Sequence, residues 1–283
     1  MLGLLQNKTL VMWGKNDPGV NQSTIPLALR GLQFEDIAAS VGTAYALDTS
    51  GNLYAWGDNL YGERNIPVNA RTGVKAVAAG ARFAFAVLND GSVVAWGRND
   101  FGQTNLPAGL TNVIAVDGGD RHAVALKADG TVIAWGDNRR GQASVPPGLS
   151  GVIAVSAGEN HTLALLNNGQ VVGWGANTAG QLSIPTSKII NVVAIAAGRE
   201  SSLAVTADGN LVAWGNRRYI TFKGNYAGQV YSVDSDNQNS IMGLRDGGVL
   251  VAGNNLSNVF VSRTRTLTPS NTRTATATRT PTP

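Results

Sequence analysis

Short apolar and β-branched runs recur along the chain, and glycine-containing turns separate them. The clearest unit, VIAVSAGENHTLALLNNGQVVGWGANTAGQLSIP, spans Val152 to Pro185. Its apolar segments predict strands at residues 152–157, 161–166 and 171–174. Asn168-Gly169 predicts a hairpin turn, because both residues tolerate positive φ. The loop Trp-Gly-x-Asn-x-x-Gly-Gln leads to a short segment that ends at Pro185 and suits an edge strand, so each unit is predicted to be a four-stranded antiparallel sheet.

The dipeptide Trp-Gly marks successive copies of this unit. It occurs at Trp13, Trp56, Trp96, Trp135, Trp174 and Trp214. Ala252-Gly253 is a degraded seventh copy, and neighbouring copies lie 38 to 43 residues apart. Four-stranded units repeated about every 40 residues predict an all-β, seven-bladed β-propeller. The regular helical periodicity that a βαβ fold would need is missing.

The two ends of the chain suggest how such a ring closes. The first copy begins at its second strand, near Leu4, and lacks an innermost strand. Residues 256–261, LSNVFV, resemble the strand openings of other copies, so we expect residues 258–262 to supply that strand and to latch the termini together. The alternative is that the missing strand is encoded upstream. The expected domains are a propeller over residues 1–262 and a disordered, low-complexity Thr/Pro/Arg linker or stalk over residues 263–283.

Composition limits the chemistry that this fold could carry. The absence of cysteine excludes disulfides and thiol nucleophiles, and two histidines, His122 and His161, leave little material for a metal site. We expect no cofactor and no metal. The net charge of +4 comes from four arginines in residues 262–283, so the propeller itself is formally neutral. A neutral body argues against nucleic acid as the partner, because phosphate binding needs clustered positive charge.

The motifs resemble the regulator of chromosome condensation repeat family, whose pattern combines Gly-x-x-His-x-x-Ala-Leu with Trp-Gly-x-Asn-x-x-Gly-Gln. Residues 119–126 and 135–142 match it fully, and the Val/Leu/Ile-Pro after Gly-Gln is similar to the bacterial branch that contains the type II β-lactamase inhibitory protein. The resemblance implies a seven-bladed propeller that acts as a binding platform through its loops. The copies at residues 41–43, 199–201 and 237–240 lack the histidine, and residues 216–219 lack the Gly-Gln loop. The nucleotide-exchange role of eukaryotic members is not carried over.

Most recurring residues are interpreted as structural. Burying an indole removes about 150–250 Å² from water, so the six tryptophans are expected to pack blade against blade rather than to stack on a ligand. His122 and His161 recur at one repeat position, which favours a structural hydrogen bond over a general base. The loop asparagines and glutamines and the aspartates before hairpin glycines are expected to bind backbone groups in turns. No catalytic residue is proposed, and the chain is not expected to be an enzyme.

The variable loops carry the candidate binding residues. In an antiparallel meander the first and third turns lie at one end of the sheet, so the Gly-x-x-His and Trp-Gly loops should share one face. Arg, Tyr and Phe are enriched among interface anchors. The partner-binding candidates on this face are Tyr61, Arg82, Phe101, Asp120, Arg121, Arg139, Arg140, Glu159, Asn160, Arg199, Glu200, Arg217, Arg218 and Tyr219.

These observations favour a non-catalytic, monomeric platform that recognises a macromolecule, with a protein preferred. One alternative is a carbohydrate or cell-wall recognition module on a Thr/Pro stalk, although this rim offers few aromatic residues. Another is the regulatory propeller domain of a larger secreted protein. Neither a secretory leader nor a transmembrane run is visible, so the stalk-like tail alone suggests an extracellular or cell-surface location.

Overall fold

The computed structural model describes residues 2–5, 7–12, 21–216, 218, 220, 227–235, 239–244 and 249–253. These residues form twenty strands and two short 3₁₀ helices, η1 (Leu27–Leu29) and η2 (Val68–Ala70). The strands are β1 (Leu2–Leu4), β2 (Leu10–Met12), β3 (Phe34–Ala39), β4 (Thr43–Asp48), β5 (Leu53–Gly57), β6 (Val74–Gly80), β7 (Phe83–Leu88), β8 (Val93–Gly97), β9 (Val113–Gly118), β10 (His122–Lys127), β11 (Val132–Gly136), β12 (Val152–Ala157), β13 (His161–Leu166), β14 (Val171–Gly175), β15 (Val192–Ala197), β16 (Ser201–Thr206), β17 (Leu211–Gly215), β18 (Val230–Ser235), β19 (Asn239–Leu244) and β20 (Val249–Gly253).

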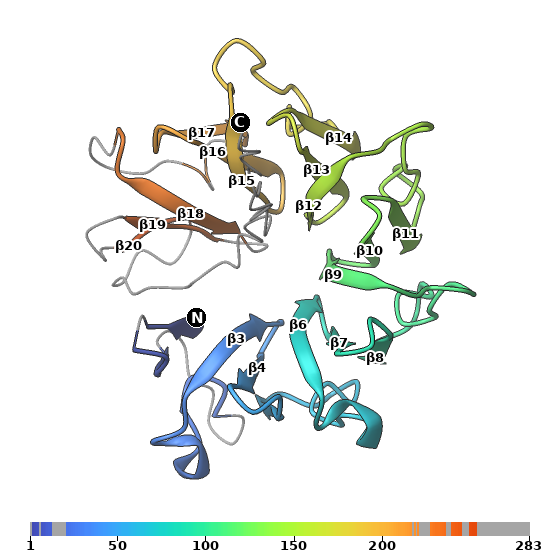
Figure 1. Cartoon of the computed structure of the whole chain (residues 1–283), viewed down its shortest axis with the longest axis vertical. Coiled ribbons are helices and arrows are strands. Elements are labelled where there is room, and N and C mark those ends of the chain that lie inside the picture. The colour runs from blue at the N-terminus through green and yellow to red at the C-terminus, as the bar shows by residue number, and fades with distance from the viewer. Residues whose placement is uncertain are drawn as a thin grey trace, which may run out of the picture.

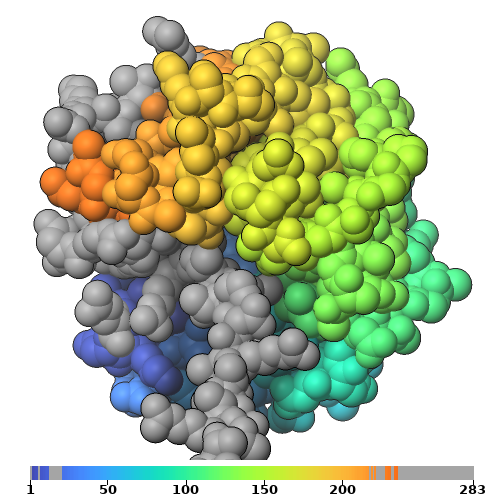
Figure 2. Space-filling model, turned by 45° about the horizontal axis from the view of Figure 1, so that its top comes forward, coloured from blue at the N-terminus to red at the C-terminus, as the bar shows by residue number. Residues whose placement is uncertain are grey.

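The strands form one two-stranded and six three-stranded antiparallel sheets, each built from strands consecutive in the sequence. The sheets are arranged around a central axis (Figure 1), with β3, β6, β9, β12, β15 and β18 innermost in the three-stranded sheets. From β3 to β15, each of these inner strands contacts the inner strand of the next sheet. In the space-filling view, successive repeats pack side by side around the molecule (Figure 2). The prediction of an all-β propeller is confirmed.

The expected fourth strand of each repeat is absent from the described residues. The proline segments turn instead of pairing with the third strand: η1 and η2 follow Pro26 and Pro67, and the N–H of Leu110 donates to the carbonyl of Pro107 at 3.3 Å. Proline has φ near −55° at Pro26 and Pro67, which suits the start of a 3₁₀ turn. The prediction of four-stranded units is therefore corrected to three strands followed by a proline-initiated turn.

The first sheet has only β1 and β2, paired from Leu2 with Met12 to Leu4 with Leu10. These strands correspond to the second and third strands of the other sheets, so the inner position has no described strand. Several predicted features lie outside the described residues: the latch at residues 258–262, the tail at residues 263–283, and Trp13, Arg217 and Tyr219. The latch and the domain boundary at residue 262 stay predictions.

The core is divided into layers between neighbouring sheets. In one layer Leu163 and Leu165 of β13 pack with Ile195 of β15, Ala204 of β16 and Trp214 of β17, and all five are buried. Burying a leucine or isoleucine side chain contributes about 1.5–3 kcal/mol relative to exposing it. Each of these layers therefore stabilises the two sheets on either side of it, which makes the end of the propeller a rigid base for loops.

Polar side chains also join the inner strands around the axis. The N–H of Ala157 donates to Oδ2 of Asp117 at 2.8 Å, and the N–H of Ala197 donates to Oγ of Ser156 at 3.0 Å. Burial raises the pKa of Asp117 to about 7, against the effect of its backbone hydrogen bonds, and the charge of Asp234 raises it further. Each contact satisfies a backbone N–H at the inner edge of the next sheet, where no further strand pairs with it.

Candidate functional site

The loops before the middle strands and the loops after the third strands lie at the same end of the propeller, as the meander predicts. His122 pairs with Gly136 in the β10–β11 ladder, so the two loops meet there. The N–H of Asp137 donates to the carbonyl of Arg121 at 2.8 Å. Gly136 has φ 91°, and a Cβ there would lie 2.6 Å from that carbonyl oxygen, which explains the glycine after each tryptophan. We call this end of the molecule the loop face.

Four of the described tryptophans hold neighbouring repeats together beneath the loop face. The indole Nε1 of Trp174 donates at 2.9 Å to the carbonyl of Gln142, which belongs to the preceding repeat. The Gln142 side chain accepts the N–H of Arg140 at 2.8 Å within its own loop. The same geometry joins Trp96 to Glu63, Trp135 to Gln103 and Trp214 to Gln181. The described indoles of these positions are buried, so they stabilise the face and are not available to a ligand.

The two histidines belong to the same supporting layer. The hydroxyl of Thr162 donates to the Gln142 carbonyl at 2.9 Å and therefore accepts from Nε2 of His122, also at 2.9 Å. His161 makes the equivalent contact with Ser202 at 3.0 Å. Nδ1 of each ring is buried and has no hydrogen-bond partner among the described residues. Burial lowers the pKa of His122 to about 3 and that of His161 to about 4, so both rings are neutral near pH 7.

These two histidines are expected to make stability depend on pH. Their ordinary pKa is 6.5, so between pH 7 and 5.5 the unfolded chain gains protons that the folded protein excludes. The free energy of unfolding should fall by about 2–3 kcal/mol from this source over that range. Replacing both rings by phenylalanine, which stands at the equivalent position as Phe83, should remove this dependence.

Urea unfolding of both proteins at pH 7 and 5.5 measures the difference. Asp117, whose raised pKa acts in the opposite direction, is common to both and cancels in the comparison. Equal pH dependence in the double variant His122→Phe/His161→Phe and the parent would contradict the assignment.

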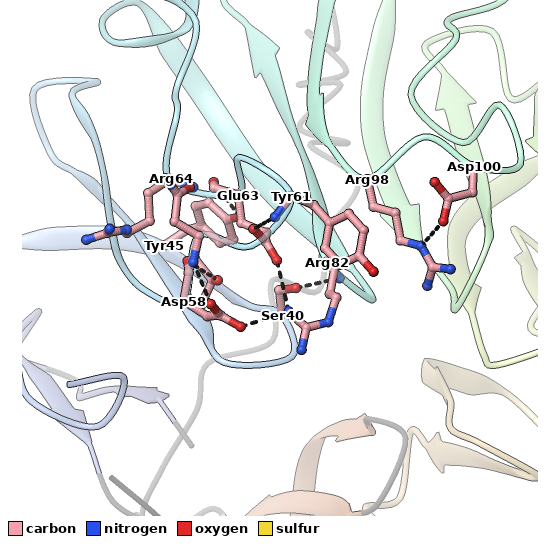
Figure 3. A network of polar contacts seen from close by, with 11 residues as sticks. Ser40, Tyr45, Asp58, Tyr61, Glu63, Arg64, Arg82, Arg98 and Asp100 are labelled. Carbon is pink, nitrogen blue, oxygen red and sulfur yellow. Dashed lines mark hydrogen bonds and ion pairs between the residues drawn. The ribbon is translucent and has the colours of Figure 1, made fainter. Parts of the chain in front are cut away.

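On the loop face, arginines surround an aromatic ring contributed by the preceding repeat. Nη1 of Arg82 lies 2.8 Å from Asp58 and 3.2 Å from Glu63, and its guanidinium carbon is 5.6 Å from the Tyr61 ring centre. The guanidinium carbon of Arg98 lies 5.4 Å from the centre of the same ring (Figure 3). The hydrogen bonds with Asp58 raise the pKa of Arg82 and lower that of the aspartate. We call this arrangement of one ring and two guanidinium groups an aromatic clamp.

The next pair of repeats contains a second aromatic clamp. Phe101 lies 4.6 Å from the Arg121 guanidinium carbon and 4.8 Å from that of Arg139. Arg139 also forms a two-pronged contact with Asp137, with Nε at 2.8 Å from Oδ1 and Nη2 at 2.7 Å from Oδ2. These contacts hold long side chains of the loop face in defined positions.

A shallow depression of about 380 Å³ follows the second clamp. It is lined by Asp120, Arg121, Asp137, Arg139, Arg140, Glu159 and Asn160. Nε of Arg199 pairs with Oε2 of the lining residue Glu159 at 2.8 Å. Burial raises the pKa of Glu159, and the charge of Arg199 opposes that shift. The structure thus brings candidates from two neighbouring repeats to one hollow.

The remaining candidates lie further around the loop face. Glu200 accepts a hydrogen bond from Asn216 at 2.8 Å, and Arg218 is exposed. Sequence reasoning did not single out Asp58, Glu63 and Asp137, although each holds a candidate arginine. The available signal was that Glu63 replaces the glutamine of other copies. In the described residues no group of three His, Cys, Asp or Glu could hold a metal ion.

Three-stranded sheets repeated around one axis, joined across repeats by tryptophan and carrying unlike loops at one end, define a β-propeller of sequence repeats. The chain belongs to the regulator of chromosome condensation (RCC1) repeat family. The family's repeat matches residues 34–63, 74–103, 113–142, 152–181 and 192–219, which is more than half of the chain. Comparison with curated proteins gives no match.

Solved structures with the same fold are distant in sequence. The ectodomain of the Physcomitrella patens receptor kinase CR4 has a TM-score of 0.69 and 20% identity over 85% of this chain, which spans 66% of that ectodomain, just under two thirds. The CRINKLY WD40 ectodomain of the Arabidopsis thaliana receptor kinase ACR4 has a TM-score of 0.68 and 19% identity, and the match covers 91% of this chain and 93% of that ectodomain. Prp20p from Saccharomyces cerevisiae has a TM-score of 0.64 and 20% identity, and the match covers 80% of this chain and 73% of Prp20p. No helix in the described residues has the length and apolar character needed to cross a membrane.

Proposed function

We propose that the chain is a non-catalytic binding platform that recognises a protein through its loop face. The observation that carries the proposal is the pair of aromatic clamps, which display arginine and aromatic side chains from three consecutive repeats. Two solved structures of similar fold support it: Prp20p has binding properties to Gsp1p and histones, and yeast RCC1 (Prp20) binds Kap60.

The clamps favour protein binding on energetic grounds. Ordering a long side chain at an interface costs about 0.5–1.5 kcal/mol, and here ion pairs and ring contacts already order Arg82, Arg121 and Arg139. The same contacts argue against carbohydrate recognition. Arginines stack on Tyr61 and Phe101, so these rings are less available to a sugar.

Site-specific photo-crosslinking tests which end of the propeller binds. A photo-reactive amino acid replaces Leu60 or Thr178, both exposed on the loop face. Matched controls carry it at Asn89 or Ala128, which are exposed in hairpin turns at the opposite end. Each variant is incubated with an extract of its native source, and crosslinked proteins are identified by mass spectrometry.

The loop-face positions are expected to yield the same crosslinked protein, and the hairpin positions should not. Crosslinks confined to Asn89 and Ala128 would contradict the proposed face. Efficient crosslinking to glycans rather than protein at Leu60 would favour the carbohydrate alternative.

A further inference from the structure

Three neighbouring repeat interfaces on the loop face differ at one position. The residue five places after tryptophan is Tyr61 in one repeat, Phe101 in the next and Arg140 in the third. The first two are the rings of the aromatic clamps. At the third interface, Asn160 also replaces the arginine that precedes the middle strand in the other two. The depression lies at this third interface, which has no clamp ring among its lining residues.

The charges around the depression are paired with one exception. Arg121 lies 3.1 Å from Asp120, Arg139 is held by Asp137, and Arg199 is held by Glu159. The exposed guanidinium of Arg140 has no hydrogen bond or ion pair with any described residue, and only its backbone N–H is bound. A cationic group capable of two parallel hydrogen bonds therefore stands in a hollow whose other charges already have partners.

We propose that the depression is a subsite for one carboxylate of the partner protein, bound by Arg140; this inference rests on the proposed function. A guanidinium donates two parallel hydrogen bonds to a carboxylate, and such charge-assisted pairs are stronger than neutral ones. The carboxyl groups of Asp120 and Glu159 line the same hollow, which disfavours a more highly charged phosphate group. The depression has room for the end of one acidic side chain or for a chain terminus.

Side-chain NMR of the isolated protein tests the subsite without the partner. The arginine Nε–Hε signals are followed during titration with N-acetyl-aspartic acid α-amide, which presents a side-chain carboxylate, and with N-acetylglycine, which presents a terminal one. N-acetyl-asparagine α-amide is the neutral control, and inorganic phosphate is the dianion. Arg64 serves as the reference signal, because it is exposed and its side chain forms no hydrogen bond or ion pair with a described residue.

The Arg140 signal should shift at least threefold more than that of Arg64 with one or both carboxylates, and little with the amide or phosphate. The more effective carboxylate identifies the source. Carboxylate binding should also shift the side-chain amide signal of Asn160, which lines the same depression. Arg140→Gln should abolish this Asn160 shift, whereas Arg140→Lys should retain part of it. Equal shifts for Arg140 and Arg64, or an equal response to the neutral amide, would overturn the inference.

The two proposals fail in different ways. Crosslinks confined to the hairpin end would contradict the loop face even if Arg140 binds small carboxylates. Conversely, loop-face crosslinks with no selective response at Arg140 would leave the platform standing and remove the subsite.

Discussion

Removal of residues 256–283 is expected to lower the melting temperature by about 10 °C or more. Among the described strands, the first sheet has β1 and β2 only, while the other six sheets each have an inner strand. Leu2 and Leu4 of β1 are buried and pack in the layer against the next sheet. If residues 258–262 complete this sheet, their loss removes a row of backbone hydrogen bonds and exposes apolar surface at the point where the ring closes. A loss of several kcal/mol corresponds to such a shift for a chain of this length.

A shorter deletion separates the latch from the tail. Removing residues 264–283 only should leave the melting temperature within about 2 °C of the parent, because a Thr/Pro-rich segment buries little surface. Val259→Asp in the full chain provides a third test, since it places a charge on the proposed inner strand without shortening the chain. Calorimetric melting temperatures that are equal for all four proteins would contradict the latch.

The strands were predictable because their signals are local. The apolar runs at residues 152–157 and 161–166 coincide with β12 and β13, and Asn168-Gly169 lies between β13 and β14. The prediction of a fourth strand was wrong because the same proline that suits an edge strand also starts a 3₁₀ turn. The choice depends on whether the third strand offers a partner, and residue patterns near Pro67 do not contain that information.

The hydrogen bonds of the two histidines could not be predicted from a single repeat, because they join neighbouring repeats. His122 bonds to Thr162 and His161 to Ser202, at separations of 40 and 41 residues. A signal existed, because the equivalent of His122 one repeat earlier is Phe83, and the residue corresponding to Thr162 is then Ala123. A polar ring thus stands opposite a hydroxyl and an apolar ring opposite a methyl group, and single positions read alone do not show this coupling.

The arginines of the loop face could be placed but not paired from sequence. Arg82 binds Asp58 and Glu63 of the preceding repeat, whereas Arg139 binds Asp137, only two residues away. Side chains this long reach acids in either repeat, so spacing does not decide between them. Arg139 and Arg140 are adjacent in the chain and equally plausible as anchors, yet only Arg140 lacks a carboxylate partner among the described residues.

Trp135→Ala is expected to lower the free energy of unfolding by about 3–5 kcal/mol, as large aromatic truncations in packed cores do. The Trp135 indole is buried with Phe85 and Val116 between two sheets. Its Nε1 is also the one described donor to the Gln103 carbonyl, at 2.9 Å. The truncation therefore creates a cavity and leaves a buried backbone acceptor unpaired in a single step.

Trp→Phe variants at two equivalent positions distinguish the lost hydrogen bond from lost packing. Trp174→Phe should cost about 1 kcal/mol beyond the volume change, because Thr162 still donates to the Gln142 carbonyl. Trp135→Phe should cost about 1–3 kcal/mol beyond it, because Ala123 stands where Thr162 would be and supplies no second donor. Adding Thr162→Val to Trp174→Phe should then cost more than the two single changes together. Urea unfolding of these variants measures each difference, and equal costs at the two tryptophans would show that packing alone explains their role.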